Sequence, residues 1–136
     1  MDSKFRNTTN EPAYWKRLTT ERARLIYRQV LSKMKKDKTY RNPGYTVKML
    51  AADLQTNTRY ISAALAIAAD TNYNQLVNEL RLREVRKYFK SDVYSSWSVQ
   101  NIGLLAGFSS RQAFYQAFHK VYHCTPKDYR ESLNQK

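Results

Sequence analysis

The hydrophobic positions of this 136-residue chain recur with helical spacing, and no segment shows convincing strand alternation. The pattern predicts an amphipathic helix over residues 12–36, opened by Pro12 and followed by an Asn-Pro-Gly turn at 42–44. Its expected apolar face is formed by Trp15, Leu18, Ile26, Val30 and Met34, opposite a basic face. Further helices are predicted over residues 47–54, 58–69, 73–90, 99–106, 111–122 and 126–133. The sequence therefore predicts an all-α fold of about seven helices.

Two segments, 46–70 and 98–123, repeat one design of helix, short turn and helix. Each has a small residue, Ala51 or Gly103, where a following helix must cross closely, as in a helix-turn-helix unit. The joining helix at 73–90 has a length of about 27 Å, which could hold two recognition helices roughly one DNA turn apart. The predicted core positions are Leu50, Leu54, Ile61, Leu65, Ile102, Phe114 and Phe118.

The charge of the chain points to a polyanionic partner. It has 24 Lys and Arg against 11 Asp and Glu, a formal net charge of +13, and residues 1–45 alone carry +8. No apolar run approaches a membrane span, and the N-terminus lacks a secretory signal pattern. The single cysteine, Cys124, fits a reducing compartment. We therefore expect a cytoplasmic protein with no membrane partner.

One stretch carries a family resemblance. Residues 102–118 contain a Gly-Phe turn and two phenylalanines four residues apart, and residues 125–130 read Thr-Pro-Lys-Asp-Tyr-Arg. This pattern resembles the DNA-binding domain of the AraC/XylS family of bacterial transcription regulators. The segment Leu80-Arg81-Leu82 matches the start of that family's linker helix. The resemblance covers about residues 46–132 and implies a DNA-binding domain at 46–136, preceded by a polar tail and basic helix at 1–45.

The resemblance also implies which side chains face DNA. The first recognition helix would present Thr58, Arg59, Ser62 and Ala63, and the second would present Arg111, Gln112, Tyr115 and Gln116. Their chemistry agrees, because arginine pairs with guanine O6 and N7 and glutamine with adenine N6 and N7. Helix N-termini capped by Asn57 and Ser110 can hold phosphates. The first recognition helix is rich in alanine, so we expect it to be the weaker of the two in base selection.

Several positions of this sequence differ from the family pattern or have an expected structural role. Asp70 and His123 stand where the family has glycines, and both types tolerate a left-handed backbone. Val85 replaces the usual alanine of the linker helix. The resemblance places Arg81 near Asp53, so we expect an internal role for this arginine rather than a DNA contact.

Several alternatives stay open for the N-terminal helix and for the two histidines. The 12–36 helix could pack on the first helix-turn-helix unit, pair with a second copy in a weak homodimer, or be the end of a linker from a longer regulator. His119, His123 and Cys124 have a superficial metal-site spacing without a fourth ligand. We therefore predict no metal, no cofactor and no catalytic site.

The sequence as a whole predicts a sequence-specific regulator of transcription that binds double-stranded DNA. The resemblance suggests that it contacts RNA polymerase as an activator, either as a monomer or as a weak homodimer. The competing hypotheses are a module that binds an acidic partner, a nonspecific architectural DNA-binding protein, and a metal-dependent enzyme at His119 and His123.

Overall fold

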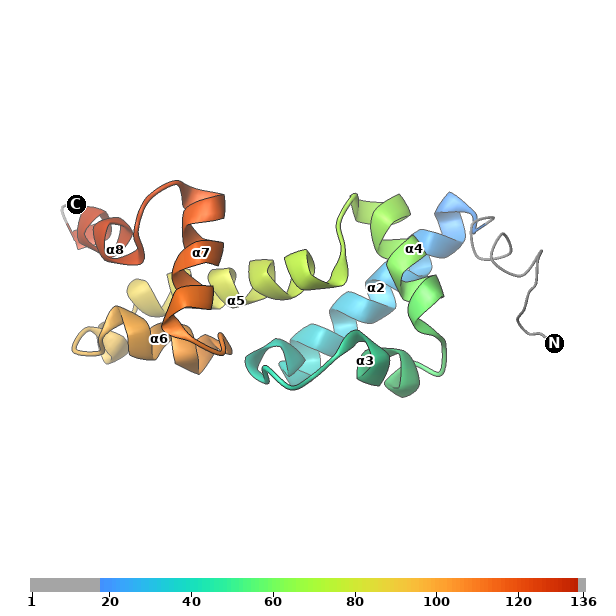
Figure 1. Ribbon diagram of the computed structural model, residues 1–136, viewed down its shortest axis with the longest axis horizontal. Coiled ribbons are helices and arrows are strands. Elements are labelled where there is room, and N and C mark those ends of the chain that lie inside the picture. Colours follow the sequence, from blue (N-terminus) through green and yellow to red (C-terminus); the bar gives the residue numbers. More distant parts are fainter. Residues whose placement is uncertain (1–17, 135–136) are drawn as a thin grey trace. The chain divides into compact units, whose positions relative to one another are not determined.

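The computed structural model describes residues 18–134, and within that range the chain is entirely helical, with no strand. The described residues form seven α-helices, the number that the sequence predicted, and Figure 1 labels them. Their bounds are α2 Thr20–Asp37, α3 Val47–Asp53, α4 Thr58–Ala69, α5 Tyr73–Phe89, α6 Val99–Ala106, α7 Arg111–Tyr122 and α8 Pro126–Asn134. Two short 3-10 turns, η2 Thr39–Arg41 and η3 Asp92–Tyr94, complete the element order.

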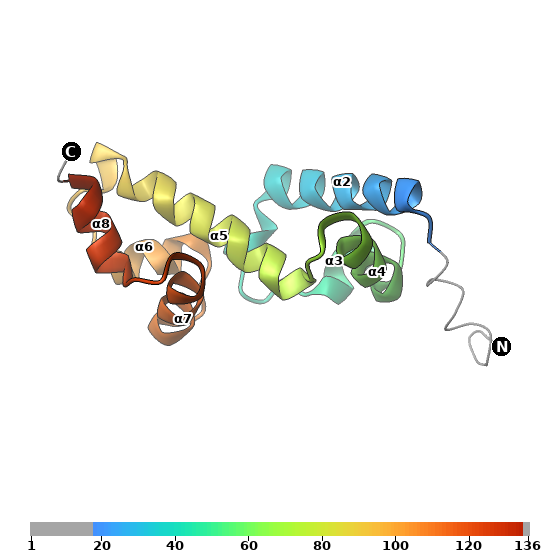
Figure 2. The same ribbon diagram turned by 90° about the horizontal axis from the view of Figure 1, so that it is seen from above.

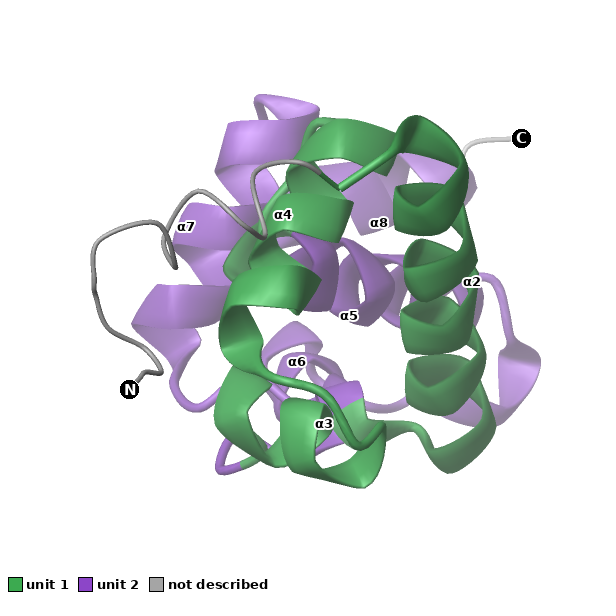
Figure 3. Cartoon of the chain, turned by 90° about the vertical axis from the view of Figure 1, so that its right-hand side faces the viewer, with its two compact units in different colours: residues 1–39, 45–75 green, residues 40–44, 76–136 purple. Residues whose placement is uncertain are grey.

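The chain divides into two compact units (Figure 3). Unit 1 consists of Met1–Thr39 and Tyr45–Gln75, and unit 2 consists of Tyr40–Gly44 and Leu76–Lys136. Each unit contains one helix-turn-helix, α3–α4 in unit 1 and α6–α7 in unit 2. The short 40–44 segment lies between α2 and α3 in the sequence but belongs to unit 2, which the sequence did not predict.

In unit 1, α2 packs against α4, as Figures 1 and 2 both show. This is the first of the three roles considered for the basic helix, packing on the first helix-turn-helix. The core of unit 1 combines small and medium side chains, since α4 is rich in alanine. Small side chains on α4 let α2 pack closely against it. The buried residues of these helices are Ala23, Val30 and Met34 of α2, Leu50 and Ala51 of α3, and Ile61, Ala64 and Leu65 of α4.

The start of the N-terminal helix differs from the prediction. The hydroxyl of Thr19 accepts a hydrogen bond from the backbone N–H of Arg22, and the backbone of Thr19 is extended. This N-cap starts α2 at Thr20, so the predicted start of this helix at residue 12 is wrong. The expected first-turn Pro12 and the expected apolar Trp15 lie outside the described residues.

In unit 2, aromatic rings dominate the core. Phe114 and Phe118 are buried and meet edge-on, with ring centroids 6.0 Å apart. Phe108 lies 5.1 Å from Phe114, and Tyr129 of α8 lies 5.4 Å from Phe118. Aromatic rings of this size bury large areas, and tilted or edge-on pairs add stability beyond that area.

The same rings explain Gly103. A β-carbon built at this position would lie 2.5 Å from the ring of Phe114. No real side chain tolerates so short a contact, so α6 and α7 cross at this distance only with glycine at the crossing. The expectation of a small residue at the helix crossing is thereby confirmed for unit 2, and in unit 1 the corresponding Ala51 is buried.

Candidate nucleic-acid interface

Both recognition helices begin where the sequence predicted, and the same type of cap starts them. The side chain of Asn57 accepts a hydrogen bond from the backbone N–H of Tyr60, 3.0 Å away, and α4 follows from Thr58. The hydroxyl of Ser110 accepts from the N–H of Ala113 at 3.0 Å, and α7 follows from Arg111. Each cap satisfies one of the free N–H groups of the first turn and leaves others available to an anion.

The exposed face of α4 has few polar side chains. Arg59 and Ser62 are exposed, whereas Thr58 and Ala63 are partly buried. Beyond them, the exposed positions of this helix are Ala66 and Ile67, neither of which has a polar side chain. The hydrogen-bonding capacity of this surface is therefore concentrated at its first turns.

The outer face of α7 is much richer in polar groups. Arg111, Gln112 and Gln116 are exposed, and Tyr115 is half-buried. The guanidinium carbon of Arg111 lies 5.1 Å from the centroid of the Tyr115 ring, and that ring meets Phe114 edge-on at 5.7 Å. The core thus orients Tyr115, and Tyr115 in turn supports Arg111 through a cation–π contact. Such support reduces the side-chain entropy that Arg111 loses on binding.

The exposed face of α7 also extends beyond the residues selected from the sequence. His119 and Lys120, one turn beyond Gln116, are exposed as well. Their spacing of three and four residues from Gln116 was the available signal, since such residues share a helix face.

The turn inside each helix-turn-helix has a left-handed residue at the same place. This residue is Gly107 in unit 2, with φ of 117°, and Gln55 in unit 1, with φ of 58°. A β-carbon on Gly107 would lie 2.2 Å from the carbonyl oxygen of Tyr40, so this turn also needs glycine to let the 40–44 segment approach. The expected left-handed ends of the recognition helices are confirmed, at Asp70 with φ of 50° and His123 with φ of 59°.

A buried carboxylate anchors the 40–44 segment in unit 2. Glu84 of α5 is 6% exposed and accepts hydrogen bonds from the hydroxyl of Tyr40 at 2.8 Å and from Nε and Nη2 of Arg41, each at 2.8 Å. Arg41 also donates to the hydroxyl of Tyr88 at 3.0 Å. One sign of this network was visible in the sequence, namely a glutamate between the apolar positions 82 and 85 of a predicted helix.

The network fixes the charge states of its members. Burial alone would raise the pKa of Glu84, but the hydrogen bonds from Arg41 and Tyr40 outweigh burial, so the pKa lies below its usual value. Burial, together with the hydrogen bond to Glu84, raises the pKa of Tyr40 to about 12, so its phenol remains a donor at neutral pH. Glu84 is therefore an ionised, fully bonded acceptor inside unit 2.

Arg81 has the internal role expected for it. Its Nε donates to the carbonyl oxygen of Tyr40 at 2.6 Å, and its guanidinium lies over the ring of Phe108, 5.5 Å from the centroid. Asp53, the neighbour suggested by the resemblance, accepts a hydrogen bond from the hydroxyl of Tyr45 and lies 3.9 Å from Nζ of Lys33. Arg81 thus helps to hold the 40–44 segment against the turn at Phe108.

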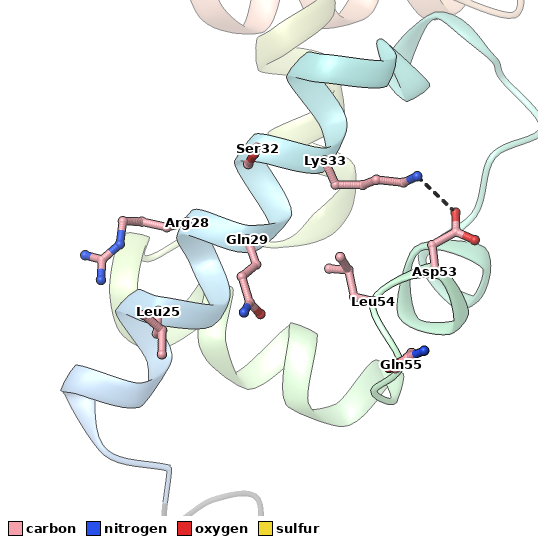
Figure 4. A pocket seen from close by; sticks show the side chains of 8 residues that line it. All are labelled: Leu25, Arg28, Gln29, Ser32, Lys33, Asp53, Leu54 and Gln55. Carbon is pink, nitrogen blue, oxygen red and sulfur yellow. Dashed lines mark ion pairs between the residues drawn. The ribbon is translucent and has the colours of Figure 1, made fainter.

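Unit 1 also has an open cleft of about 570 Å³ between α2 and the turn that follows α3 (Figure 4). Lys33 and Asp53 form an ion pair across it. The side chains that line it are Leu25, Arg28, Gln29, Ser32, Lys33, Asp53, Leu54 and Gln55. None of the predicted DNA-contacting residues lines this cleft, so it lies apart from the candidate DNA surface of α4.

Two further findings concern other classes of site. Within residues 18–134, no group of three or more His, Cys, Asp and Glu side chains is arranged to hold a metal ion. His119 and His123 are neighbours, with ring centroids 6.5 Å apart. Over the same range, no helix combines the length and apolar character needed to cross a bilayer.

Comparison with known proteins agrees with this geometry. The family model described as "Helix-turn-helix domain" matches residues 50–132, more than half of the chain. The regulatory protein PocR of Salmonella typhimurium (strain LT2) is 27% identical over 108 residues, which cover 76% of this chain and 35% of PocR. The chain thus spans about a third of that relative's length, and no solved structure matches it. Two capped helix-turn-helix units and the family match together show that the chain belongs to the AraC-type helix-turn-helix family, the DNA-binding domains of transcription regulators.

Proposed function

We propose that this chain binds a specific double-stranded DNA sequence through two recognition helices and thereby regulates transcription. The observation that carries the proposal is the outer face of α7. An arginine and two glutamines are exposed there, starting at a capped helix N-terminus. These side chains are the ones that pair with base edges in the major groove.

The proposed roles on α7 follow from side-chain chemistry. Arg111 donates two hydrogen bonds to O6 and N7 of a guanine, and Gln112 or Gln116 pairs with N6 and N7 of an adenine. Tyr115 restrains Arg111 through the contact between its ring and the guanidinium. The free N–H groups of the first turn bind a phosphate and fix the register of the helix on the duplex.

The proposed roles on α4 are weaker. Arg59 contacts a base or a phosphate, Thr58 and Ser62 donate to phosphates, and Ala63 touches a thymine methyl group. The two recognition helices would occupy adjacent major-groove segments, roughly 34 Å apart along one face of the duplex. We therefore propose that α7 supplies most of the base discrimination.

The remaining parts of the proposal concern partners. The net charge of +13 supplies salt-dependent attraction to phosphates. The apolar face of α2 is used inside unit 1, which favours a monomer over a dimer through that face. Regulation of transcription through contact with RNA polymerase rests on the family alone.

The test is selection of bound duplexes from a random DNA pool at about 150 mM salt, where nonspecific binding is weak. The wild type is compared with Arg111→Ala/Gln112→Ala and, as a matched control, with Arg59→Ala. We expect a motif covering two groove segments, with one half lost in the double variant. A motif confined to one segment would show that α4 only supports the domain. Equal recovery of all sequences would overturn the proposal in favour of architectural DNA binding.

The same variants give a quantitative comparison. Arg111→Ala should weaken binding to the selected duplex by about 5- to 150-fold, the equivalent of 1–3 kcal/mol for a bidentate base contact. Arg59→Ala should have a smaller effect, and if it contacts only phosphate the loss should be equal for all sequences. Fluorescence anisotropy with the selected and a scrambled duplex measures both. Insensitivity to Arg111→Ala would favour an acidic partner instead of DNA.

A further inference from the structure

The exposed face of α7 continues past its glutamines to two histidines. At 100° per residue, residues 112, 116 and 119 lie within about 60° of one another around the axis of α7. All three are exposed, as is His123, the residue that caps the end of the helix. Gln112, Gln116 and His119 lie opposite the buried Phe114 and Phe118, which hold α7 to the core (Figure 2 shows this helix). His119 is therefore aligned with the side chains proposed to contact bases.

A hollow beside His119 has one lysine and no carboxylate among the described residues that line it. This shallow hollow of about 430 Å³ is lined by Tyr115, Gln116, His119, Lys120, Thr125 and Pro126. The titratable residues that line this hollow with His119 are Tyr115 and Lys120 of α7, while Thr125 and Pro126 are uncharged. The imidazoles of His119 and His123 are 6.5 Å apart.

The chain has two histidines, and both lie at this end of α7. Imidazole is the side chain that ordinarily changes charge between pH 5 and 8, whereas carboxylates, lysines and arginines keep theirs. A DNA phosphate or purine edge would favour the imidazolium, which donates from both nitrogens. A change of pH in this range therefore acts on the proposed DNA surface at α7.

We propose that His119 is a further DNA-contacting residue of α7, which donates a hydrogen bond as an imidazolium and makes DNA binding tighter as the pH falls. The inference rests on the proposed function, because it needs α7 to lie against DNA. It goes beyond that function by assigning a new contact residue and a dependence on protons.

The experiment is a titration of the selected duplex by fluorescence anisotropy at pH 7.5 and pH 6.0, at constant ionic strength and with a chelator present. For the wild type we expect binding to tighten about three- to fivefold at the lower pH, as uptake of one proton predicts. His119→Gln should abolish most of that change. His123→Asn, the matched control, retains a residue suited to the left-handed cap and should keep most of it.

The other outcomes overturn the inference or specify it. Unchanged pH dependence in His119→Gln, or its loss only in His123→Asn, would disprove the role of His119. Weaker binding of His119→Gln to all duplexes would identify a phosphate contact, and an altered preference at one position of the selected motif would identify a base contact. A scrambled duplex, titrated in parallel, provides the pH test even if selection yields no motif.

The failure of this inference is distinguishable from failure of the proposed function. If the wild type selects a motif that Arg111→Ala/Gln112→Ala loses, the proposed function stands whatever His119→Gln does. In that case, identical pH dependence of the wild type and His119→Gln would reject only the contact by His119.

Discussion

The two helix-turn-helix units of this protein share one arrangement of helices and differ in the side chains that form their cores. Both place a small residue at the helix crossing, a left-handed residue in the turn and a polar N-cap before the recognition helix. Unit 2 uses glycine at the crossing and aromatic rings inside, whereas unit 1 uses alanine at the crossing and aliphatic side chains. The helix crossing thus has a small, buried residue in both units, while the side chains that fill the rest of the core differ in type.

The exposed faces of the two recognition helices, α4 and α7, differ in their polar side chains. The α4 face ends in alanine and isoleucine, while the α7 face presents arginine, glutamine and histidine along its whole length. The side chains that differ are exposed and lie outside both cores, so packing requirements do not explain this difference. Comparing the two units therefore distinguishes the core residues that the helix-turn-helix needs in order to fold from the exposed residues that we propose select DNA.

The two units also differ in where their charges lie. Unit 2 contains the buried Glu84, with hydrogen bonds from Tyr40 and Arg41, whereas unit 1 has the exposed pair of Lys33 and Asp37. Removing Glu84 would leave the buried hydroxyl of Tyr40 without its acceptor and Arg41 without its ion-pair partner, whereas removing Asp37 from the exposed pair changes little.

The largest effect is therefore expected from Glu84→Ala. We expect it to lower the free energy of unfolding by about 3 kcal/mol, because it leaves Arg41 and the Tyr40 hydroxyl without their acceptor. Asp37→Ala, the matched change in the exposed ion pair of unit 1, should have a much smaller effect. Urea unfolding followed by circular dichroism measures both changes in stability. Equal effects of the two variants would contradict the proposed difference between the buried Glu84 network and the exposed ion pair.

The Glu84 network also predicts a pH dependence. Because the pKa of Glu84 is lowered in the folded state, its contribution to stability is complete above the unfolded-state pKa and is lost as the pH falls through the folded-state pKa. The stability difference between the wild type and Glu84→Gln should therefore be largest at pH 7 and shrink below about pH 4. A difference that grows on acidification would show that the carboxylate is protonated in the fold.

The next effect concerns the left-handed turn residues. Gly107→Ala should cost about 2–3 kcal/mol, because its β-carbon meets the backbone of Tyr40 and its φ is unfavourable for alanine. Gln55→Gly, the matched change in unit 1, should alter stability by no more than about 0.5 kcal/mol, since relief of left-handed strain offsets the added chain entropy. Thermal unfolding compares them, and a neutral Gly107→Ala would refute the close approach of the 40–44 segment.

The smallest effect is expected from the N-caps. Asn57→Ala and Ser110→Ala should each lower the free energy of unfolding by about 1 kcal/mol, because each leaves an N–H of the first turn without its acceptor. Ser110→Asn serves as a conservative control for Ser110→Ala. If α7 dominates DNA selection, then Ser110→Ala should weaken binding more than Asn57→Ala, and the reverse order would identify α4 as the stronger contact.

Much of the fold could be predicted because its signals are local. The caps at Asn57 and Ser110, the left-handed ends at Asp70 and His123, and the apolar spacing of the recognition helices all act within one or two turns of chain. The start of α2 was missed by the prediction because Thr19 offers a competing cap inside the apolar pattern. The role of α2 became clear only from its contact with α4, because the spacing of its apolar residues does not reveal which helix it packs against.

The sequence by itself determined the helices, the two repeated units and the set of side chains that can pair with bases, because periodicity and capping are properties of neighbouring residues. Tertiary structure alone decided that Glu84 lies buried between Tyr40 and Arg41, that Gly107 meets the backbone of Tyr40, and that Tyr115 supports Arg111. The first two of these contacts join residues more than forty positions apart, and the third depends on the ring of Phe114 behind Tyr115. Burial and close approach arise only when distant segments pack, so no local pattern records them.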